Sequence, residues 1–229
     1  MSRLTKILIA SAVAVVLLVV GGGFAVYKIF IESDPEPPAK ITKTTTVEGG
    51  ALDGTYRVGP GDTNSFVGYR VQEQLVGGVV EQTATGRTSD ITGSFTITDR
   101  TVQDVTVTAD LRTLTSDRTQ RDDAIKDRGL ESNRFPEAKF VLSEPIERPT
   151  VPAVGETVTA TARGEFTLHG VTKQVEIPLE GRWDGRDVQV VGRLHIVFSD
   201  YGIQAPTSPV VASIDDEGEM EFQLFFRKA

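Results

Sequence analysis

The clearest pattern in the chain is an alternation of apolar and polar residues from Thr157 to Trp183. Apolar or small residues occupy one phase and Thr, Arg and Glu the other, as expected for β-structure with one buried face. The alternation breaks only at His169-Gly170, which is short enough for a tight turn. We therefore predict one long antiparallel hairpin. Because a hairpin cannot bury its apolar face alone, the remaining chain must supply the covering sheet.

The same alternation recurs along most of the chain from residue 55 onward. It predicts further strands over residues 55–58, 65–72, 79–87, 91–98, 105–111, 188–198 and 220–226. Many antiparallel strands without helical crossovers indicate an all-β sandwich or closed barrel. A barrel is favoured because closure removes exposed strand edges in a chain with almost no helices to cover them.

One segment, Ser116 to Leu130, departs from the strand pattern. Ser116 is a typical helix N-cap and Gly129 a typical C-cap. Between them, Ala124 and Ile125 give a weak apolar face. We predict one short helix here, inserted between strands and covering one end of the barrel.

The N-terminal residues 1–31 are predicted to be a transmembrane signal anchor. Residues 7–31 are apolar apart from small polar residues and Lys28, and as a helix they would extend roughly 37 Å, enough to cross a hydrocarbon core of about 30 Å. Arg3 and Lys6 precede this run and acidic residues follow it, which predicts a cytoplasmic N-terminus and an extracytoplasmic domain. A cleaved signal peptide and a secreted protein are the alternative, although no clear small-x-small cleavage site follows the run.

Residues 32–50 are rich in Pro and Thr and poor in large apolar residues, so we predict an extended linker there. The barrel domain is predicted to occupy residues 51–229. The 229-residue chain contains no cysteine, which excludes disulfides, thiol catalysis and cysteine-bound metal. Its net charge of -8 and its lack of a basic block argue against nucleic acid as a partner.

The sequence offers few groups for catalysis. His169 lies in the predicted turn, where its ring most simply hydrogen-bonds backbone, and His195 lies on the polar phase of its strand. The two histidines share no strand face and no metal-ligand spacing, so neither a metal site nor a cofactor is predicted. The adjacent carboxylates at 122–123 and 215–217 point in different directions and are expected to be solvated. We predict that the protein is not an enzyme.

The inward phases mix small residues with large aromatic ones. An eight-stranded barrel has an interior that side chains either fill or leave open for one small ligand. Interdigitation of large and small side chains would fill the interior, whereas an incomplete fit would leave a narrow apolar tunnel. The alternation alone leaves both interpretations open.

Several stretches together carry a family resemblance: Ile91–Phe95 (ITGSF), Ala109–Asp122 (ADLRTLTSDRTQRD), Phe135–Leu142 (FPEAKFVL), Gly164–Val175 (GEFTLHGVTKQV) and Phe198–Gly202 (FSDYG). From about Thr55 to Lys228 the chain resembles the YceI-like proteins. The resemblance implies an extended antiparallel lipocalin-like β-barrel whose interior holds a polyisoprenoid or similar amphiphile, usually in secreted or periplasmic proteins.

The leading hypothesis is a membrane-anchored, extracytoplasmic carrier that binds a polyisoprenoid or other long-chain amphiphilic lipid in its apolar interior and performs no chemistry. The candidate lipid-contacting residues are Phe66, Phe95, Val107, Leu111, Phe140, Leu142, Phe166, Leu168, Ile177, Leu194 and Phe222. Arg121, Asp122 and His169 are the candidates for contacting a polar head at the barrel mouth. The alternative is a non-catalytic interaction module of the cell envelope in which the barrel is only a scaffold. No sequence pattern decides between a monomer and a homodimer.

Overall fold

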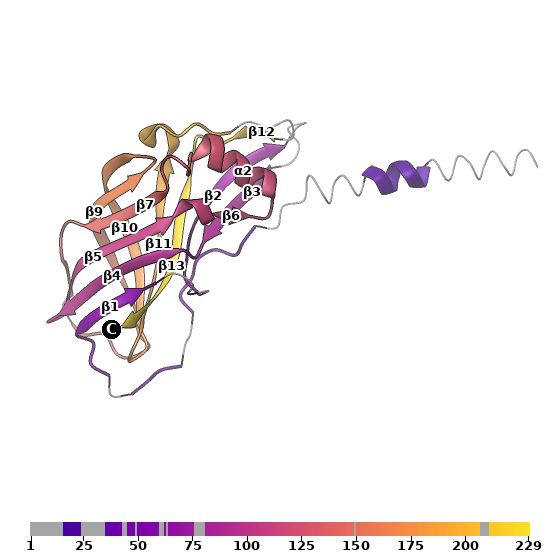
Figure 1. The fold of residues 1–229 in the computed structure, drawn as a ribbon. Helices are drawn as coiled ribbons and strands as arrows, with labels where there is room; N and C mark the ends of the chain where they lie inside the picture. The colour runs from indigo at the N-terminus through magenta and orange to yellow at the C-terminus, as the bar shows by residue number, and fades with distance from the viewer. Residues whose placement is uncertain are drawn as a thin grey trace, which may run out of the picture.

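The computed structural model describes residues 16–23, 35–42, 45–48, 50–59, 62, 64–75, 81–148, 150–206 and 211–229. The domain is a β-barrel with a short helical segment at one end (Figure 1). Its strands are β1 (Gly54–Val58), β2 (Phe66–Leu75), β3 (Glu81–Thr88), β4 (Ile91–Thr98), β5 (Thr101–Asp110), β6 (Thr115–Ser116), β7 (Glu137–Leu142), β8 (Ile146–Glu147), β9 (Thr157–Leu168), β10 (Val171–Trp183), β11 (Val188–Val197), β12 (Val211–Ile214) and β13 (Glu217–Lys228). Its helical turns are η2 (Leu111–Thr113), α2 (Thr119–Ala124), η3 (Ile125–Gly129) and η4 (Phe198–Tyr201).

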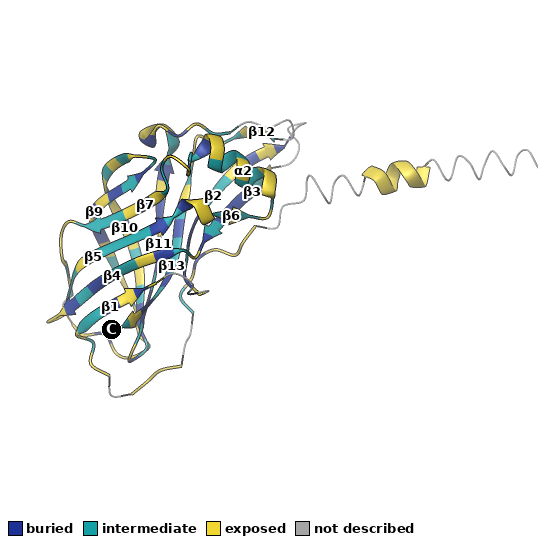
Figure 2. Ribbon diagram, viewed as in Figure 1, coloured by how far each residue is buried: buried dark blue, intermediate teal, exposed yellow. Residues whose placement is uncertain are grey.

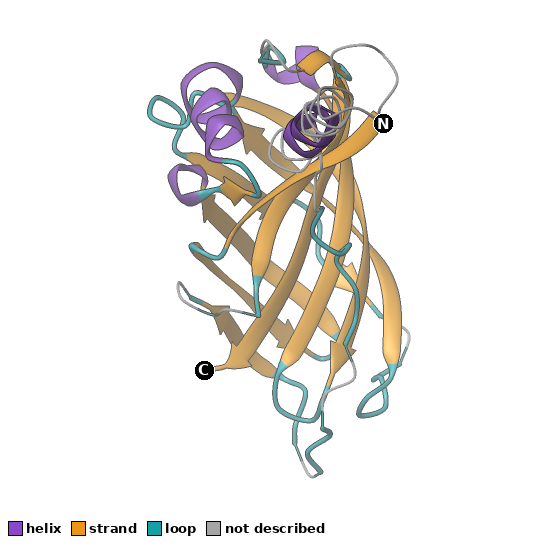
Figure 3. Ribbon diagram, turned by 90° about the vertical axis from the view of Figure 1, so that its right-hand side faces the viewer, coloured by secondary structure: helices purple, strands orange, loops and turns teal. Residues whose placement is uncertain are grey.

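The barrel closes through its first and last strands. Each neighbour is hydrogen-bonded to the next in the order β1-β4-β5-β7-β9-β10-β11-β13, and β13 also pairs with β1, which completes a ring of eight strands among the described residues. Farther along, β13 pairs with β2 instead, and β3 and β6 extend the wall from there. Figure 3 shows the strands inclined around the enclosed interior. The predicted all-β antiparallel barrel is confirmed.

The hairpin predicted from Thr157 to Trp183 is present as β9 and β10. The two strands pair antiparallel from Val171 opposite Leu168 to Arg182 opposite Thr157. His169 and Gly170 form the turn with φ of 51° and 76°. Positive φ at both turn residues matches the right-handed twist of the flanking strands, and glycine tolerates it without strain.

The inward phases of the strands meet in the interior, and burial alternates along most strands (Figure 2). The Phe95 ring lies between two other aromatic rings, with centroids 5.1 Å from Tyr56 and 4.7 Å from Phe226. A second cluster packs around Phe166, whose ring lies edge-on to Tyr201 at 5.9 Å. The two clusters occupy different parts of the barrel interior.

The predicted helix is present but shorter than expected. Ser116 belongs to β6, α2 begins at Thr119, and the helical turns include Gly129, so the C-cap is Leu130 rather than Gly129. Ser116 still stabilises the start of the helix, because its hydroxyl accepts a hydrogen bond from the Arg118 N–H at 3.2 Å. Ser116 therefore acts from two residues before Arg118, which occupies the N-cap position.

Residues 35–42, 45–48 and 50, hereafter the strap, are the described part of the extended linker predicted for residues 32–50. The strap crosses the outside of the barrel. Its backbone N–H groups donate hydrogen bonds to the side chains of Thr85 on β3, Glu221 on β13 and Gln189 on β11. Ala39 is only 6% exposed. Nothing in the sequence indicated these contacts, because the strap contributes few apolar groups of its own and is held by polar side chains that project from the barrel wall.

Residues 16–23 are helical and exposed, and the remainder of the predicted anchor lies outside the described residues. None of the helices in the described parts of the chain has the length and apolar character needed to cross a membrane.

Candidate functional site

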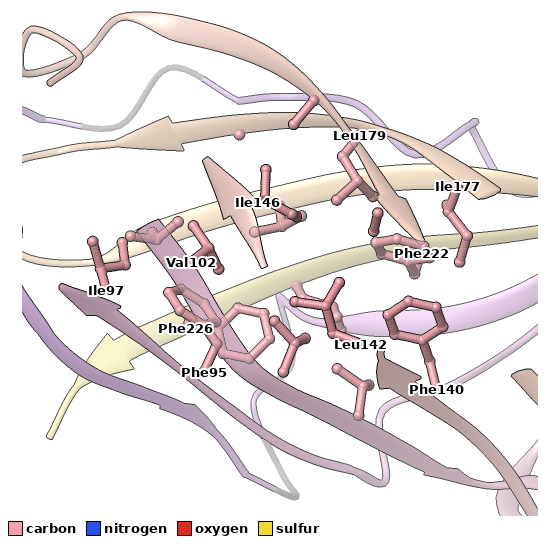
Figure 4. Close-up of a pocket in the computed structure, with 18 of the residues that line it drawn as sticks. Phe95, Ile97, Val102, Phe140, Leu142, Ile146, Ile177, Leu179, Phe222 and Phe226 are labelled. Atoms are coloured by element: carbon pink, nitrogen blue, oxygen red, sulfur yellow. The ribbon is translucent and has the colours of Figure 1, made fainter. Parts of the chain in front are cut away.

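A cavity of about 190 Å³ occupies the barrel interior. Its wall comes from almost every strand of the ring, and Figure 4 shows the apolar side chains that line it. The aromatic part of the wall consists of Phe95, Phe140, Phe166, Trp183, Phe222 and Phe226. No carboxylate of the described residues lines it. The interior is therefore not completely filled by interdigitating side chains.

A second cavity of about 130 Å³ lies beneath the helical segment. Ile125, Gly129 and Leu130 from that segment line it, so the helix covers this end of the interior as predicted. The two cavities have four lining residues in common: Val67, Ala138, Phe166 and Met220. The two cavities therefore adjoin at this shared set of residues.

The second cavity also adjoins the surface. A groove of about 500 Å³ lies between η4 and β12, and five of its lining residues also line the second cavity: Phe198, Ile203, Ala205, Pro206 and Ile214. The groove and the two cavities thus adjoin one another in a series from the surface into the barrel. An extended apolar chain is the ligand shape that fits such a series.

Most of the predicted lipid-contacting residues line the cavities. Seven of them line the first cavity: Phe95, Val107, Phe140, Leu142, Phe166, Ile177 and Phe222. Leu111 and Leu168 line the second, together with Phe166. The structure contains no ligand that tests their role, so contact with lipid remains a prediction for each.

Phe66 and Leu194 are the exceptions. Phe66 was predicted to point inward, but Val67 takes the inward phase and the Phe66 ring packs under the Arg87 guanidinium, 3.7 Å from the ring centroid. The phase was misjudged because both residues are apolar and the cation covers the outward ring. Leu194 is buried in the cluster around Phe166 and lines neither cavity.

Of the three predicted head-contacting residues, only Arg121 reaches a cavity. It lines the second cavity, where its Nη2 lies 2.6 Å from a carboxylate oxygen of Glu73, and it also bonds Asp117. The Tyr69 hydroxyl is buried beside the same cavity without a partner among the described residues. Desolvation by burial raises the pKa of Tyr69 well above its ordinary value, so this hydroxyl stays protonated.

Asp122 and His169 have local structural partners instead. Asp122 accepts hydrogen bonds from the Ser116 hydroxyl at 2.6 Å and the Ser116 N–H at 2.8 Å. The His169 ring lies 2.9 Å from both the Tyr201 carbonyl and a Glu131 carboxylate oxygen, and it packs against Phe135. The expected backbone bond of His169 is present, although it goes to η4 rather than to its own turn.

Three polar side chains that the sequence analysis did not single out line the opposite end of the first cavity: Arg148, Arg182 and Trp183. Arg182 bonds the carbonyls of Gly155 and Thr42 at 2.9 and 3.1 Å. Trp183 was visible only as the last inward residue of the hairpin. Arg148 lies in a loop outside any alternation and gave no signal.

The described residues contain no group of three or more histidines, cysteines or carboxylates arranged to hold a metal ion. His195 is exposed, as its polar phase predicted. The site as built can enclose an apolar molecule and offer it a few hydrogen-bond donors.

Comparison with known proteins agrees with this architecture. Residues 56–226 match the family model described as the YceI-like domain. A UPF0312 protein of Pseudomonas fluorescens is 29% identical over 140 residues, which cover 57% of this chain and 70% of that protein. A UPF0312 protein of Pseudomonas putida is 28% identical over 167 residues, which cover 69% and 81% of the two chains.

Solved structures share the fold at lower identity. A polyisoprenoid binding domain from Saccharophagus degradans, implicated in plant cell wall breakdown, superposes with a TM-score of 0.59 at 18% identity, covering 77% of this chain and 99% of its own. BcnA of Burkholderia cenocepacia superposes with a TM-score of 0.53 at 20% identity, covering 70% and 95%. At these identities the likeness establishes the fold alone.

Proposed function

Because the chain belongs to the YceI-like domain family, we propose that it binds a polyisoprenoid or similar long-chain amphiphilic lipid in the barrel interior. The binding is non-covalent, and the protein carries or sequesters its ligand without transforming it. The match over residues 56–226 gives this premise. The structural neighbour described as polyisoprenoid binding supports the ligand class.

The observation that carries the proposal is the series of adjoining spaces formed by the groove and the two cavities, of which the first cavity is lined almost entirely by apolar side chains. Burial of apolar surface stabilises a complex by roughly 0.8 kcal/mol for each methylene-sized group, before the cost of ordering the chain. A lipid tail of a few isoprene units therefore needs no polar contact to be retained. The wall of the first cavity, which has no carboxylate among the described residues, suits such a tail better than it suits a polar metabolite.

We further propose that the barrel works beside the membrane that residues 1–31 span, on its extracytoplasmic side. Glu36 lies five positions after Ile31, and its backbone N–H donates a hydrogen bond to the Thr85 hydroxyl on the barrel. Even fully extended, five residues reach only about 18 Å. An anchor ending at Ile31 would therefore hold the barrel wall close to the lipid surface.

The experiment is mass spectrometry of an organic extract from the full-length protein, purified in detergent from its native envelope without added lipid. A stoichiometric prenyl lipid or other long-chain amphiphile is the expected result. An empty extract from a folded protein would overturn the carrier proposal and leave a scaffold for loop-mediated interactions.

A matched pair of variants ties retention to the cavity. Gly181 lines the first cavity, and a Cβ added there would meet no atom closer than 3.8 Å, so Gly181→Leu places its side chain in the free space. Glu180→Leu adds the same side chain to the exposed face of the same strand. We expect Gly181→Leu to lose most of the bound lipid and Glu180→Leu to keep it. Equal retention by both variants would contradict the assignment of the site.

A further inference from the structure

The donors at the far end of the first cavity are buried without partners. Trp183 is 7% exposed, and among the described residues its indole Nε1–H meets no acceptor. The same holds for the Nε–H of Arg148, which lines the same cavity. A buried donor without an acceptor is costly, and native proteins almost always satisfy such groups. Two of them beside one cavity indicate that something else supplies the acceptor.

The local structure explains why these donors lie together. Arg148 directly follows β8, and Trp183 ends β10. The loop that joins β8 to β9 is held against β10, because the Gly155 N–H donates to the Trp183 carbonyl at 2.7 Å and the Arg182 Nε–H donates to the Gly155 carbonyl. Both donors therefore belong to elements fixed at the same end of the cavity.

We propose that a polar head with hydrogen-bond-accepting oxygens lies at this end, bonded by the indole N–H of Trp183 and the guanidinium of Arg148, while the lipid chain runs toward the helical segment. The inference rests on the proposed lipid binding and extends it by fixing the direction of the ligand and the chemistry of its head. A ring carbonyl or a carboxylate supplies such oxygens. A head that only donates hydrogen bonds does not satisfy this end.

The opposite end of the interior suits such a head poorly. There the Tyr69 hydroxyl is also a buried donor without a partner among the described residues, but Glu73 lines the same cavity and its side chain is only 3% exposed. A carboxylate repels an acceptor oxygen. The cation at that end, Arg121, is already paired with Glu73 at 2.6 Å. The acceptor head is therefore assigned to the end lined by donors alone.

The direction can be read from fluorescence, because Trp183 is the only tryptophan in the chain. Two probes are titrated into the full-length wild-type protein in detergent: a benzoquinone bearing three prenyl units, and a three-unit prenyl carboxylic acid with a bromine at the far end of its chain. The quinone head should quench Trp183 strongly and the chain-end bromine weakly. Stronger quenching by the bromine, or equal quenching by both, would overturn the proposed direction.

Calorimetry on variants tests the contacts themselves. Trp183→Phe and Arg148→Met each remove a donor but keep most of the apolar side chain, and each should weaken binding of the quinone and of the unlabelled prenyl carboxylic acid about tenfold. A prenyl hydrocarbon of equal length, which lacks a head, should bind both variants within about twofold of wild type. Arg193→Met is the matched control, because Arg193 lies on the exposed face of β11 and lines neither cavity, and it should leave all three affinities unchanged. Tyr69→Phe removes the buried donor of the second cavity and compares the two ends: it should not weaken the headed probes relative to the hydrocarbon.

The outcomes separate the two proposals. If the wild type binds hydrocarbon and headed probes equally and Trp183→Phe changes neither, the head site is wrong while lipid binding stands. A loss in Tyr69→Phe instead of Trp183→Phe would place the head under the helix and overturn the inference. If the wild type binds none of the probes, the proposed function itself fails. The tighter binder of the quinone and the carboxylate identifies a neutral or an anionic head.

Discussion

The two faces of β13 differ in what they bury: the inner face borders an apolar cavity, and the outer face holds a paired carboxylate. On the inner face, Phe222 and Leu224 border a cavity whose wall is apolar and incompletely filled. On the outer face, Glu221 is 0% exposed, yet its carboxylate accepts hydrogen bonds from the Ala39 N–H at 3.0 Å, from Arg87 at 2.9 Å and from Arg70 at 3.4 Å. The buried carboxylate of the outer face is matched to three donors, whereas the interior keeps free space and donors without acceptors among the described residues.

The two faces of β13 therefore contribute differently to the structure. Buried charges tolerate only one arrangement, because removing any partner leaves an uncompensated charge, and so the outer face fixes how the strap lies on the barrel. An apolar wall places no directional demand on what it contacts, and so the interior can accept a flexible chain. The outer face of β13 thus fixes the position of the strap, and the inner face can adapt to a flexible ligand.

The largest effect should come from breaking the outer ion cluster. Glu221→Gln keeps the shape but leaves Arg70 and Arg87 without their buried anion, which should lower the free energy of unfolding by about 3–5 kcal/mol. Urea denaturation measures it. Glu219→Gln is the control on the same strand. The Glu219 side chain is 46% exposed, and its ion pair with Arg193 is long at 3.9 Å, so the free energy of unfolding should change by less than about 1 kcal/mol. Equal changes in the two variants would erase the contrast.

The second-largest effect on stability should come from alkaline pH, through the buried Tyr56 that stacks on Phe95. Burial, helped by nearby carboxylates, raises the pKa of Tyr56 to about 12 from its ordinary value of 10.0. Between these values the unfolded chain releases the proton and the folded one keeps it, so the free energy of unfolding falls as the pH rises from about 10 to 12, by up to about 3 kcal/mol. Tyr56→Phe should flatten this part of a stability profile, although it also loses the hydroxyl bond to the Leu52 carbonyl. Identical profiles for the two proteins would refute the assignment.

A smaller effect is expected where the strap meets β11. The side chain of Gln189 is buried, accepts hydrogen bonds from the Thr42 N–H at 2.9 Å and donates to the Lys40 carbonyl at 3.0 Å. Gln189→Leu leaves both groups unpaired and should cost about 1–3 kcal/mol, with faster hydrogen exchange at Thr42. Gln174→Leu, on an exposed position of β10, is the control for adding a leucine. Unchanged exchange at Thr42 would mean that Gln189 does not hold the strap.

The smallest effect should come from adding a methyl group at two glycines of the barrel wall, one beside free space and one beside a ring that already fills the space. Gly181→Ala should stabilise the protein by about 0.5–1 kcal/mol, because the new methyl group meets nothing closer than 3.8 Å and glycine is costly within a strand. Gly192→Ala on β11 should destabilise it, since a Cβ there would lie 2.5 Å from the Phe222 ring. Thermal unfolding compares the two variants. The same sign of change in both would show that the first cavity is not free space.

Periodicity made most of the barrel predictable. The hairpin of β9 and β10 was placed because its inward and outward phases differ along its whole length, so only one register buries the apolar side chains. The phase failed at Phe66, where two apolar residues are adjacent and the outward one is covered by Arg87. Alternation identifies the buried face only where the other face is polar.

The strap and the donor end were not predictable in the same way. Ala39 is buried by contacts with side chains from strands far away in the sequence, and a segment rich in Pro and Thr gives no local sign of this. Arg148 and Trp183 become notable only because each lacks an acceptor in the folded protein. The predicted head residues were instead two charged residues of the predicted helix and His169 of the hairpin turn, and Arg121 and Asp122 have partners of their own.

The pairing of β1 with β13 has a consequence for how the protein folds. The Ala39 N–H donates a hydrogen bond to the side chain of Glu221, which lies 182 positions later in the sequence. Strand β1 completes the ring only by pairing with the last strand of the domain, β13. Contacts over such sequence distances form slowly, because a long loop must close before they stabilise anything. The N-terminal part of the domain is synthesised first, yet it must wait for β13. Until that seam closes, the interior is open along its side, and a lipid taken up then would be enclosed by folding itself.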